Sequence, residues 1–190
     1  MTARPVGHTG RLRAKETGGA SGAGADIERL PLAAILDDIR SLWNVGSIFR
    51  TADGCGVAKL WLAGITGTPP RAEITKTALG AEEQVAWEYR ANVLEAVEQA
   101  RAGGYEPVVV EATEESAGVG EFAWPERPCL VLGNEATGVS PLVLEACDRR
   151  VSIPMCGVKE SFNVAEAFGI AAHHAATALA PASPGVVFRR

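Results

Sequence analysis

Asn44 and Arg50 lie in the segment WNVGSIFRTADG, whose residue types could bind an anionic group. Asn44 is of a type that caps helices, so a helix is predicted to begin there. Gly46, Arg50 and Gly54 then fall on one helical face at a spacing of four. The two glycines would clear space around the arginine for a bulky anionic partner. Asp53 offers an alternative, a surface ion pair with Arg50 worth under ~1 kcal/mol, and the spacing leaves both interpretations open.

A second segment, CLVLGNEATGVSPL, joins an apolar run to Gly133, as a buried strand joins a phosphate-binding loop. Phosphate-binding loops follow their glycines with lysine and a hydroxyl, whereas Asn134 and Glu135 stand here. A carboxylate repels phosphate. No G-x-x-x-x-G-K-[ST] segment is present, and no G-x-G-x-x-G segment follows the first predicted strand. These features argue against nucleoside triphosphates, nicotinamide cofactors and a flavodoxin-like nucleotide-binding protein.

A third segment, IPMCGVKESFNVAEA, leaves a predicted strand through Ile153, Pro154 and Met155. Ser161 and Asn163 then begin a predicted helix, and residues of these types often do no more than cap one. Proline inside a strand is unusual, so Pro154 indicates a strand end or a bulge.

Short apolar runs alternate with helix-length segments through the rest of the chain. Strands are predicted at residues 32–36, 58–64, 84–89, 107–112, 129–133 and 150–155, and helices from Asn44 and at 72–79, 91–104, 141–147 and 161–179. Strands of continuous Val, Ile and Leu are buried on both faces, which predicts an α/β fold with a parallel sheet flanked by helices. Ligands in such sheets bind at the carboxyl ends of the strands, so the loops there are the predicted site.

The chain has 190 residues, 47% of them apolar, which predicts one soluble domain over residues 27–181. A flexible, glycine-rich leader is predicted at 1–26 and a short tail at 182–190. The net charge is −5, yet six basic residues lie in the two tails: Arg4, Arg11, Arg13, Lys15, Arg189 and Arg190. The basic leader could follow the phosphate backbone of a nucleic acid or serve only as a solubilising arm.

Targeting and redox features are few. No run approaches the ~18 apolar residues of a membrane span, and the N-terminus lacks the apolar core of a secretory signal. The four cysteines are scattered without a C-x-x-C pair, and the chain has three histidines. This pattern argues against a metal site or a disulfide framework and favours the cytoplasm.

Together the three segments resemble one family. An N-x-G-x-[IL]-x-R-T segment, a G-N-E-x-x-G-[VIL] loop and an I-P-M-x-G-x-x-S-x-N-V-A segment, in this order, are similar to the motifs of the SpoU (TrmH-like) branch of the SPOUT RNA methyltransferases. The resemblance covers roughly residues 30 to 180. It implies a C-terminal deep trefoil knot, a homodimer, S-adenosylmethionine as cofactor and no metal. The implied reaction is methylation of a ribose 2′-hydroxyl in RNA, and the alternative is a catalytically inactive RNA-binding module of the same fold.

The resemblance also implies the site residues. The implied cofactor pocket is lined by Glu111, Ala112, Gly133, Asn134, Ile153, Met155 and Ser161. Glycine at 133 would let backbone amides approach the ligand. Because the cofactor carries a sulfonium and an ammonium but no phosphate, an acidic loop suits it.

The implied catalytic residue is Arg50, acting either by stabilising the ribose alkoxide or as the base. Asn44 would orient Arg50 or the ribose, while Glu135 and Asn163 would brace the knot and the dimer interface. A chain that keeps this set is expected to be active.

Few features of the sequence bear on which class of RNA is the substrate. Many relatives carry an additional N-terminal RNA-binding domain where this chain shows only the leader, so tRNA is predicted rather than rRNA. Phe162 and Glu166 depart from the residue types common in relatives at those positions. His173 and His174 are assigned no role.

Overall fold

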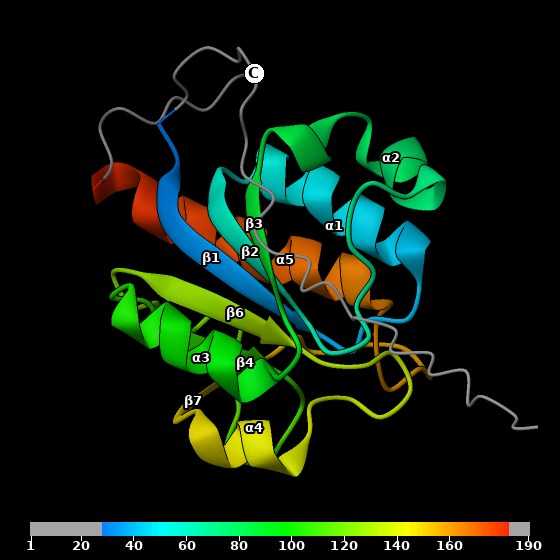
Figure 1. Ribbon diagram of the computed structural model, residues 1–190. Coiled ribbons are helices and arrows are strands. Elements are labelled where there is room, and N and C mark those ends of the chain that lie inside the picture. The colour runs from blue at the N-terminus through cyan, green and yellow to red at the C-terminus, as the bar shows by residue number, and fades with distance from the viewer. Residues whose placement is uncertain (1–27, 183–190) are drawn as a thin grey trace, which may run out of the picture.

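The computed structural model describes residues 28–182 (Figure 1). The predicted leader lies outside this range, as does the predicted tail from residue 183 onward. The strands are β1 (Leu30–Asp37), β2 (Val57–Ala63), β3 (Ala86–Arg90), β4 (Glu106–Val110), β5 (Ala117–Gly118), β6 (Pro128–Leu132) and β7 (Arg149–Ser152). The helices are α1 (Leu42–Gly54), α2 (Ala72–Ala78), α3 (Val93–Ala102), α4 (Pro141–Ala146) and α5 (Val164–Leu179), with 3₁₀ turns at Ala81–Glu83 and Ala180–Ala182.

All seven strands form one sheet in the order β3-β2-β1-β6-β4-β7-β5, and every neighbouring pair is parallel. The parallel α/β fold is therefore confirmed. Strand β5 was not predicted, because two residues of Ala and Gly carry no apolar pattern. Leu36, the penultimate residue of β1, pairs with Leu132, the last residue of β6, so the loops that follow these strands leave the sheet side by side.

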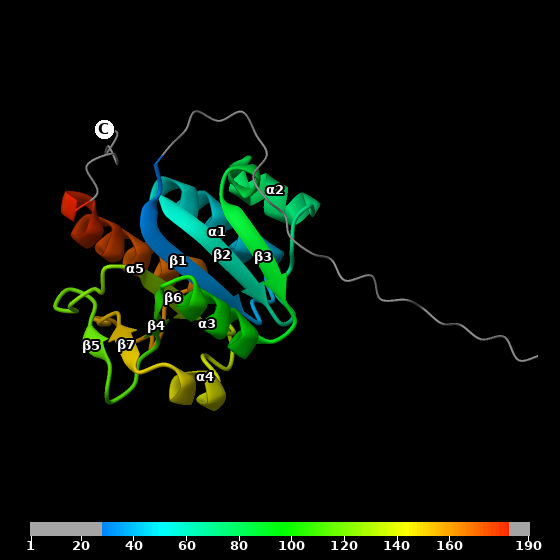
Figure 2. The same cartoon turned by 60° about the vertical axis from the view of Figure 1, so that its left-hand side comes forward.

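Helices cover both faces of the sheet, with α1 and α5 on one side and α3 and α4 on the other (Figures 1 and 2). Alternate residues of β1 enter the two cores: Leu36 packs with α1 and α5, and Ile35 packs with α3. Both residues are fully buried, as expected for a central parallel strand. On α5, Phe168, Ala171 and Ala175 are buried, whereas His173 and His174 are exposed.

Helix α1 begins earlier than predicted. Its N-cap is Ser41, whose Oγ accepts a hydrogen bond from the Asn44 backbone N–H at 3.3 Å. The prediction that Asn44 caps the helix was wrong, and its side chain is left available for other contacts. Gly46 does not clear space around Arg50, because it is buried against α2, where a Cβ would lie 2.0 Å from Thr77 Oγ1.

Asp37, at the end of β1, is a buried carboxyl with 7% exposure. Burial, and then the charge of neighbouring Asp38, raises its pKa from 3.8 to about 6. The folded protein therefore holds this proton at pH values where the unfolded chain has released it. Folding stability should fall as the pH rises from about 4 to 6, by up to roughly 3 kcal/mol.

Asp37→Asn should remove this pH dependence. The free energy of unfolding of both chains would be measured by urea denaturation at pH 4.5 and pH 7.5. The variant minus the unsubstituted chain should give a value at least ~1 kcal/mol larger at pH 7.5 than at pH 4.5. The exposed Asp148 provides a matched control, Asp148→Asn, for which no such difference is expected. An equal effect of Asp37→Asn at both pH values would contradict the raised pKa.

Candidate active site

A cavity of about 510 Å³ opens at the carboxyl ends of the strands, between the loops that follow β4, β6 and β7 and the start of α5. All seven residues of the predicted cofactor pocket line it: Glu111, Ala112, Gly133, Asn134, Ile153, Met155 and Ser161. Glu135 lines it as well. Further lining residues were not predicted as site residues, namely Val110, Thr113, Leu132, Ala136, Thr137, Gly138, Val139, Leu144, Glu160, Phe162, Val164 and Ala167. Most of these adjoin the second and third segments, so extending each segment by a few residues would have found them.

One wall of the cavity is the tight loop after β6. The Asn134 N–H donates to the Gly138 carbonyl at 3.1 Å, and the Gly138 N–H donates to the Asn134 carbonyl at 2.9 Å. Asn134 Oδ1 also accepts from the Ala136 N–H at 2.9 Å. A Cβ at position 133 would lie 2.3 Å from the Gly138 carbonyl oxygen. The reason predicted for Gly133 was ligand access, and the structure adds that the chain folds back against it.

Glu111 joins the β4 loop to this wall. One of its carboxylate oxygens accepts from the Val139 N–H at 3.0 Å, and the other accepts from the Ala112 N–H at 3.1 Å. Gly138 has a φ of +68°, and a Cβ there would lie 2.5 Å from the Glu111 carboxylate. Glu111 and Gly138 therefore set the shape of the cavity together.

Three of the four predicted catalytic residues contact one another. Asn44 Nδ2 donates to Glu135 Oε1 at 3.0 Å, and Asn163 Nδ2 donates to Asn44 Oδ1 at 3.2 Å. Glu135 also accepts from the backbone amides of Arg40 and Ser41 at 3.0 and 3.1 Å. Asn163 is in addition the N-cap of α5, so it both caps a helix and joins this network. The network ties the cavity loop to the first turns of α1 and α5.

The protonation of Glu135 follows from this network. Its partial burial favours the neutral acid, but the hydrogen bonds from the Arg40 and Ser41 amides and from Asn44 outweigh burial and hold the pKa of Glu135 below its usual value. The carboxylate is therefore charged at neutral pH, at the positive end of the α1 dipole.

Arg50 is not brought to the cavity of its own chain. It is exposed on α1, two turns after Trp43 and on the same outward face, and it does not line the cavity. The alternative pairing with Asp53 is not formed, because Asp53 pairs with Arg29 at 2.7 Å. Within residues 28–182, no acidic side chain forms an ion pair with Arg50.

Two negative observations apply to the part of the chain that the structure describes. No group of three or more His, Cys, Asp or Glu side chains is placed there to hold a metal ion. In the same residues, no helix has the length and apolar character needed to cross a membrane.

The segments that build this cavity also identify the family. The model of the SpoU rRNA Methylase family matches residues 31–173, a range that contains every loop described above. The chain belongs to this family. The family resemblance inferred from the three segments is thereby confirmed.

Individual SpoU relatives act on different RNAs. A 23S rRNA (guanosine-2′-O-)-methyltransferase RlmB of Neisseria meningitidis is 33% identical over 145 residues, which are 76% of this chain and 58% of the relative. A tRNA (guanosine(18)-2′-O)-methyltransferase of Aquifex aeolicus is 30% identical over 145 residues, 76% of this chain and 68% of the relative. The chain thus spans little more than half the length of the first relative.

The fold is shared with solved SpoU-type structures. An AdoMet-bound rRNA methyltransferase from Sinorhizobium meliloti matches with a TM-score of 0.72 and 27% identity, covering 78% of this chain and 56% of that one.

Proposed function

We propose that this chain transfers a methyl group from S-adenosylmethionine to a ribose 2′-hydroxyl of RNA, in the cytoplasm. The observation that carries the proposal is the convergence of all seven predicted cofactor residues on one cavity. Membership of the SpoU family supports it, as do relatives named 2′-O-methyltransferases and the AdoMet-bound neighbour.

The charge of the cavity suits this cofactor. Three carboxylates line it, from Glu111, Glu135 and Glu160, and no Lys, Arg or His of the described residues does so. A wall of this kind attracts the sulfonium and ammonium groups of S-adenosylmethionine and repels a nucleoside phosphate. Exposed backbone groups of the loops after β6 and β7 are suited to the polar edge of an adenine. When bound, the cofactor supplies an electrophilic methyl group.

The protein's own part is to activate a poor nucleophile. As the ribose oxygen bonds to the methyl carbon, the methyl–sulfur bond of the cofactor would break and the hydroxyl proton would pass to water, so negative charge develops on the oxygen in the transition state. We assign to Arg50 the stabilisation of that charge and the binding of the adjacent phosphate, since a guanidinium stays protonated at neutral pH. The Asn44–Glu135–Asn163 network would fix α1, and with it Arg50, relative to the cofactor loops.

A homodimer would complete the site. Arg50 points outward from α1 and is absent from the cavity of its own chain, so a second copy could place its Arg50 at this cavity. Mixing the impaired variants Arg50→Ala and Gly133→Ala, at an S-adenosylmethionine concentration too low to fill the Gly133→Ala cavity, should then restore activity to about a quarter of the unsubstituted level, because one hybrid site in a mixed dimer is intact. A mixture that exchanges subunits and stays inactive would contradict the shared site.

The proposed fold includes a C-terminal trefoil knot. Strand β7 lies beyond β4, whereas α5, which follows it, packs against α1 near the centre of the sheet. The chain must therefore recross the loops at the carboxyl edge, and such a path is compatible with a knot.

We propose tRNA as the substrate, because the tRNA-modifying Aquifex relative is matched over more of its length than the rRNA-modifying Neisseria relative. The test is transfer of labelled methyl from S-adenosylmethionine to separate pools of unmodified tRNA and 23S rRNA transcripts. Label in the tRNA pool supports the proposal, and label confined to rRNA corrects the substrate. No transfer to either, with cofactor bound, would favour the inactive module.

A further inference from the structure

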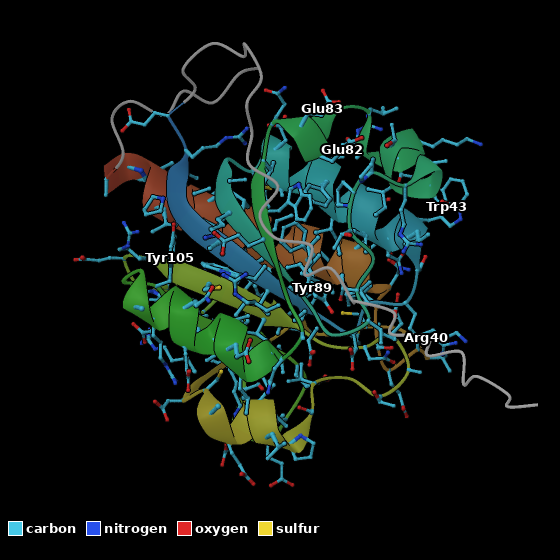
Figure 3. All side chains as sticks on the ribbon, in the orientation of Figure 1. Arg40, Trp43, Glu82, Glu83, Tyr89 and Tyr105 are labelled. Atoms are coloured by element: carbon cyan, nitrogen blue, oxygen red, sulfur yellow. The ribbon has the colours of Figure 1, made fainter. Side chains whose placement is uncertain are left out.

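Trp43 is exposed in an unusual way for a large aromatic side chain. It lies in the first turn of α1 with 47% of its surface accessible, and Lys76 Nζ of α2 lies 5.4 Å from its ring centroid. Figure 3 shows Trp43 at the outer edge of the domain beside α2, with Arg40 on the same side of the molecule. Burial in the core of residues 28–182 does not explain this tryptophan.

The backbone that carries the ring is fixed by the packing of α1 against α2. The Trp43 carbonyl oxygen accepts a hydrogen bond from Thr77 Oγ1 at 3.2 Å. One turn on, the missing side chain of Gly46 lets α2 approach so closely that a Cβ would lie 2.0 Å from the same Thr77 oxygen. The indole is therefore presented from a fixed backbone, which lowers the entropy lost when a ligand stacks on it.

The surroundings of Trp43 are positively charged. Arg40, Arg50 and Lys76 are exposed, and within residues 28–182 none of them forms an ion pair. Arg40 is tied to the cavity loop through the bond from its backbone N–H to Glu135, and Arg50 follows Trp43 on the same helix face. We call these four residues, Arg40, Trp43, Arg50 and Lys76, the Trp43 surface.

We propose that the Trp43 surface binds the RNA substrate, with a nucleobase near the target ribose stacking on the indole and Lys76 contacting a backbone phosphate. This inference rests on the proposed function, and it adds how the RNA is bound. An aromatic ring among cations is the combination that binds single-stranded nucleic acid. A two-fold axis through Trp43 would instead place Arg40 and Lys76 against their own copies, which is unfavourable. The proposed dimer needs only Arg50, two turns further along α1, to reach the partner's cavity.

The test is RNA binding by Trp43→Ala, Trp43→Phe and Lys76→Gln, measured by filter binding to unmodified tRNA transcripts over a range of salt. Trp43→Ala should weaken binding about tenfold or more, whereas Trp43→Phe keeps a stacking ring and should retain most of the affinity. Lys76→Gln should lower the slope of log affinity against log salt by about 1. Arg127→Gln, which removes an exposed cation from the loop before β6, and Leu142→Ala, which removes an exposed apolar side chain from α4, are matched controls expected to have little effect.

Two further readouts separate the explanations. S-adenosylmethionine affinity and sedimentation behaviour should be unchanged in Trp43→Ala. If Trp43→Ala bound RNA as tightly as the unsubstituted chain, the proposal would be overturned. It would also be overturned if Trp43→Ala lost RNA binding and dissociated from a dimer to a monomer together, because the surface would then be a contact with a second copy. The proposed function fails separately, if the unsubstituted chain binds RNA through Trp43 yet transfers no methyl group.

Discussion

Arg50→Ala is expected to reduce kcat about 10²-fold or more while leaving the affinity for S-adenosylmethionine nearly unchanged. Arg50 is exposed on α1 and does not line the cavity of its own chain, so its removal should leave the cofactor walls intact. The loss should fall on the step in which the ribose oxygen gains negative charge. Single-turnover methyl transfer and calorimetric titration of the cofactor measure the two quantities separately.

Two controls define the role of Arg50. Arg50→Lys keeps a positive charge but loses the planar guanidinium fork, so partial activity is expected. Arg127→Ala removes an exposed arginine from the loop before β6 and should leave kcat unchanged. If Arg50→Ala abolished cofactor binding instead, Arg50 would be a structural residue and its catalytic assignment would be wrong.

Gly133→Ala is expected to lower the affinity for S-adenosylmethionine about tenfold or more. The added methyl group would lie 2.3 Å from the Gly138 carbonyl oxygen and 2.5 Å from the Val139 nitrogen. Since the atoms that the methyl group meets belong to the backbone and not to a flexible side chain, the loop must open, at a cost on the order of 1–3 kcal/mol. The opening would also disturb the Val139 N–H bond that holds Glu111.

Gly157→Ala is the matched control, because it adds the same methyl group in a loop of the same site where nothing lies within 4 Å. Its cofactor affinity should stay within about twofold of the unsubstituted chain. Equal losses in the two variants would show that glycine flexibility, rather than the close approach at position 133, is what the site requires.

Much of the fold followed from apolar patterning. The runs at 32–36 and 129–133 are buried on both faces and form the central pair of parallel strands, as predicted. The start of α1 could not be predicted as reliably, because Ser41 and Asn44 are both capping types and only the backbone path selects Ser41. The Arg29–Asp53 pair was also beyond sequence reasoning, since it joins residues far apart in the chain.

Some features of the candidate site were likewise predicted from the sequence, and others were not. The resemblance in three segments predicted residues that the structure gathers around one cavity, because the carboxyl ends of parallel strands meet at one edge. The sequence did not indicate that Glu135 binds the amides of Arg40 and Ser41, or that Arg50 does not line the cavity of its own chain. These features depend on how α1 is rotated against the sheet, which packing with α2 and α5 determines.

The most direct test of the proposed reaction is the identity of the product. RNA labelled by this chain and methyl-labelled S-adenosylmethionine would be digested to nucleosides and separated. The proposed site predicts that all label elutes as a 2′-O-methyl nucleoside, and that Arg50→Ala slows its formation about 10²-fold or more. Label on a base, or none from unmodified transcripts of either RNA class, would contradict a ribose methyltransferase.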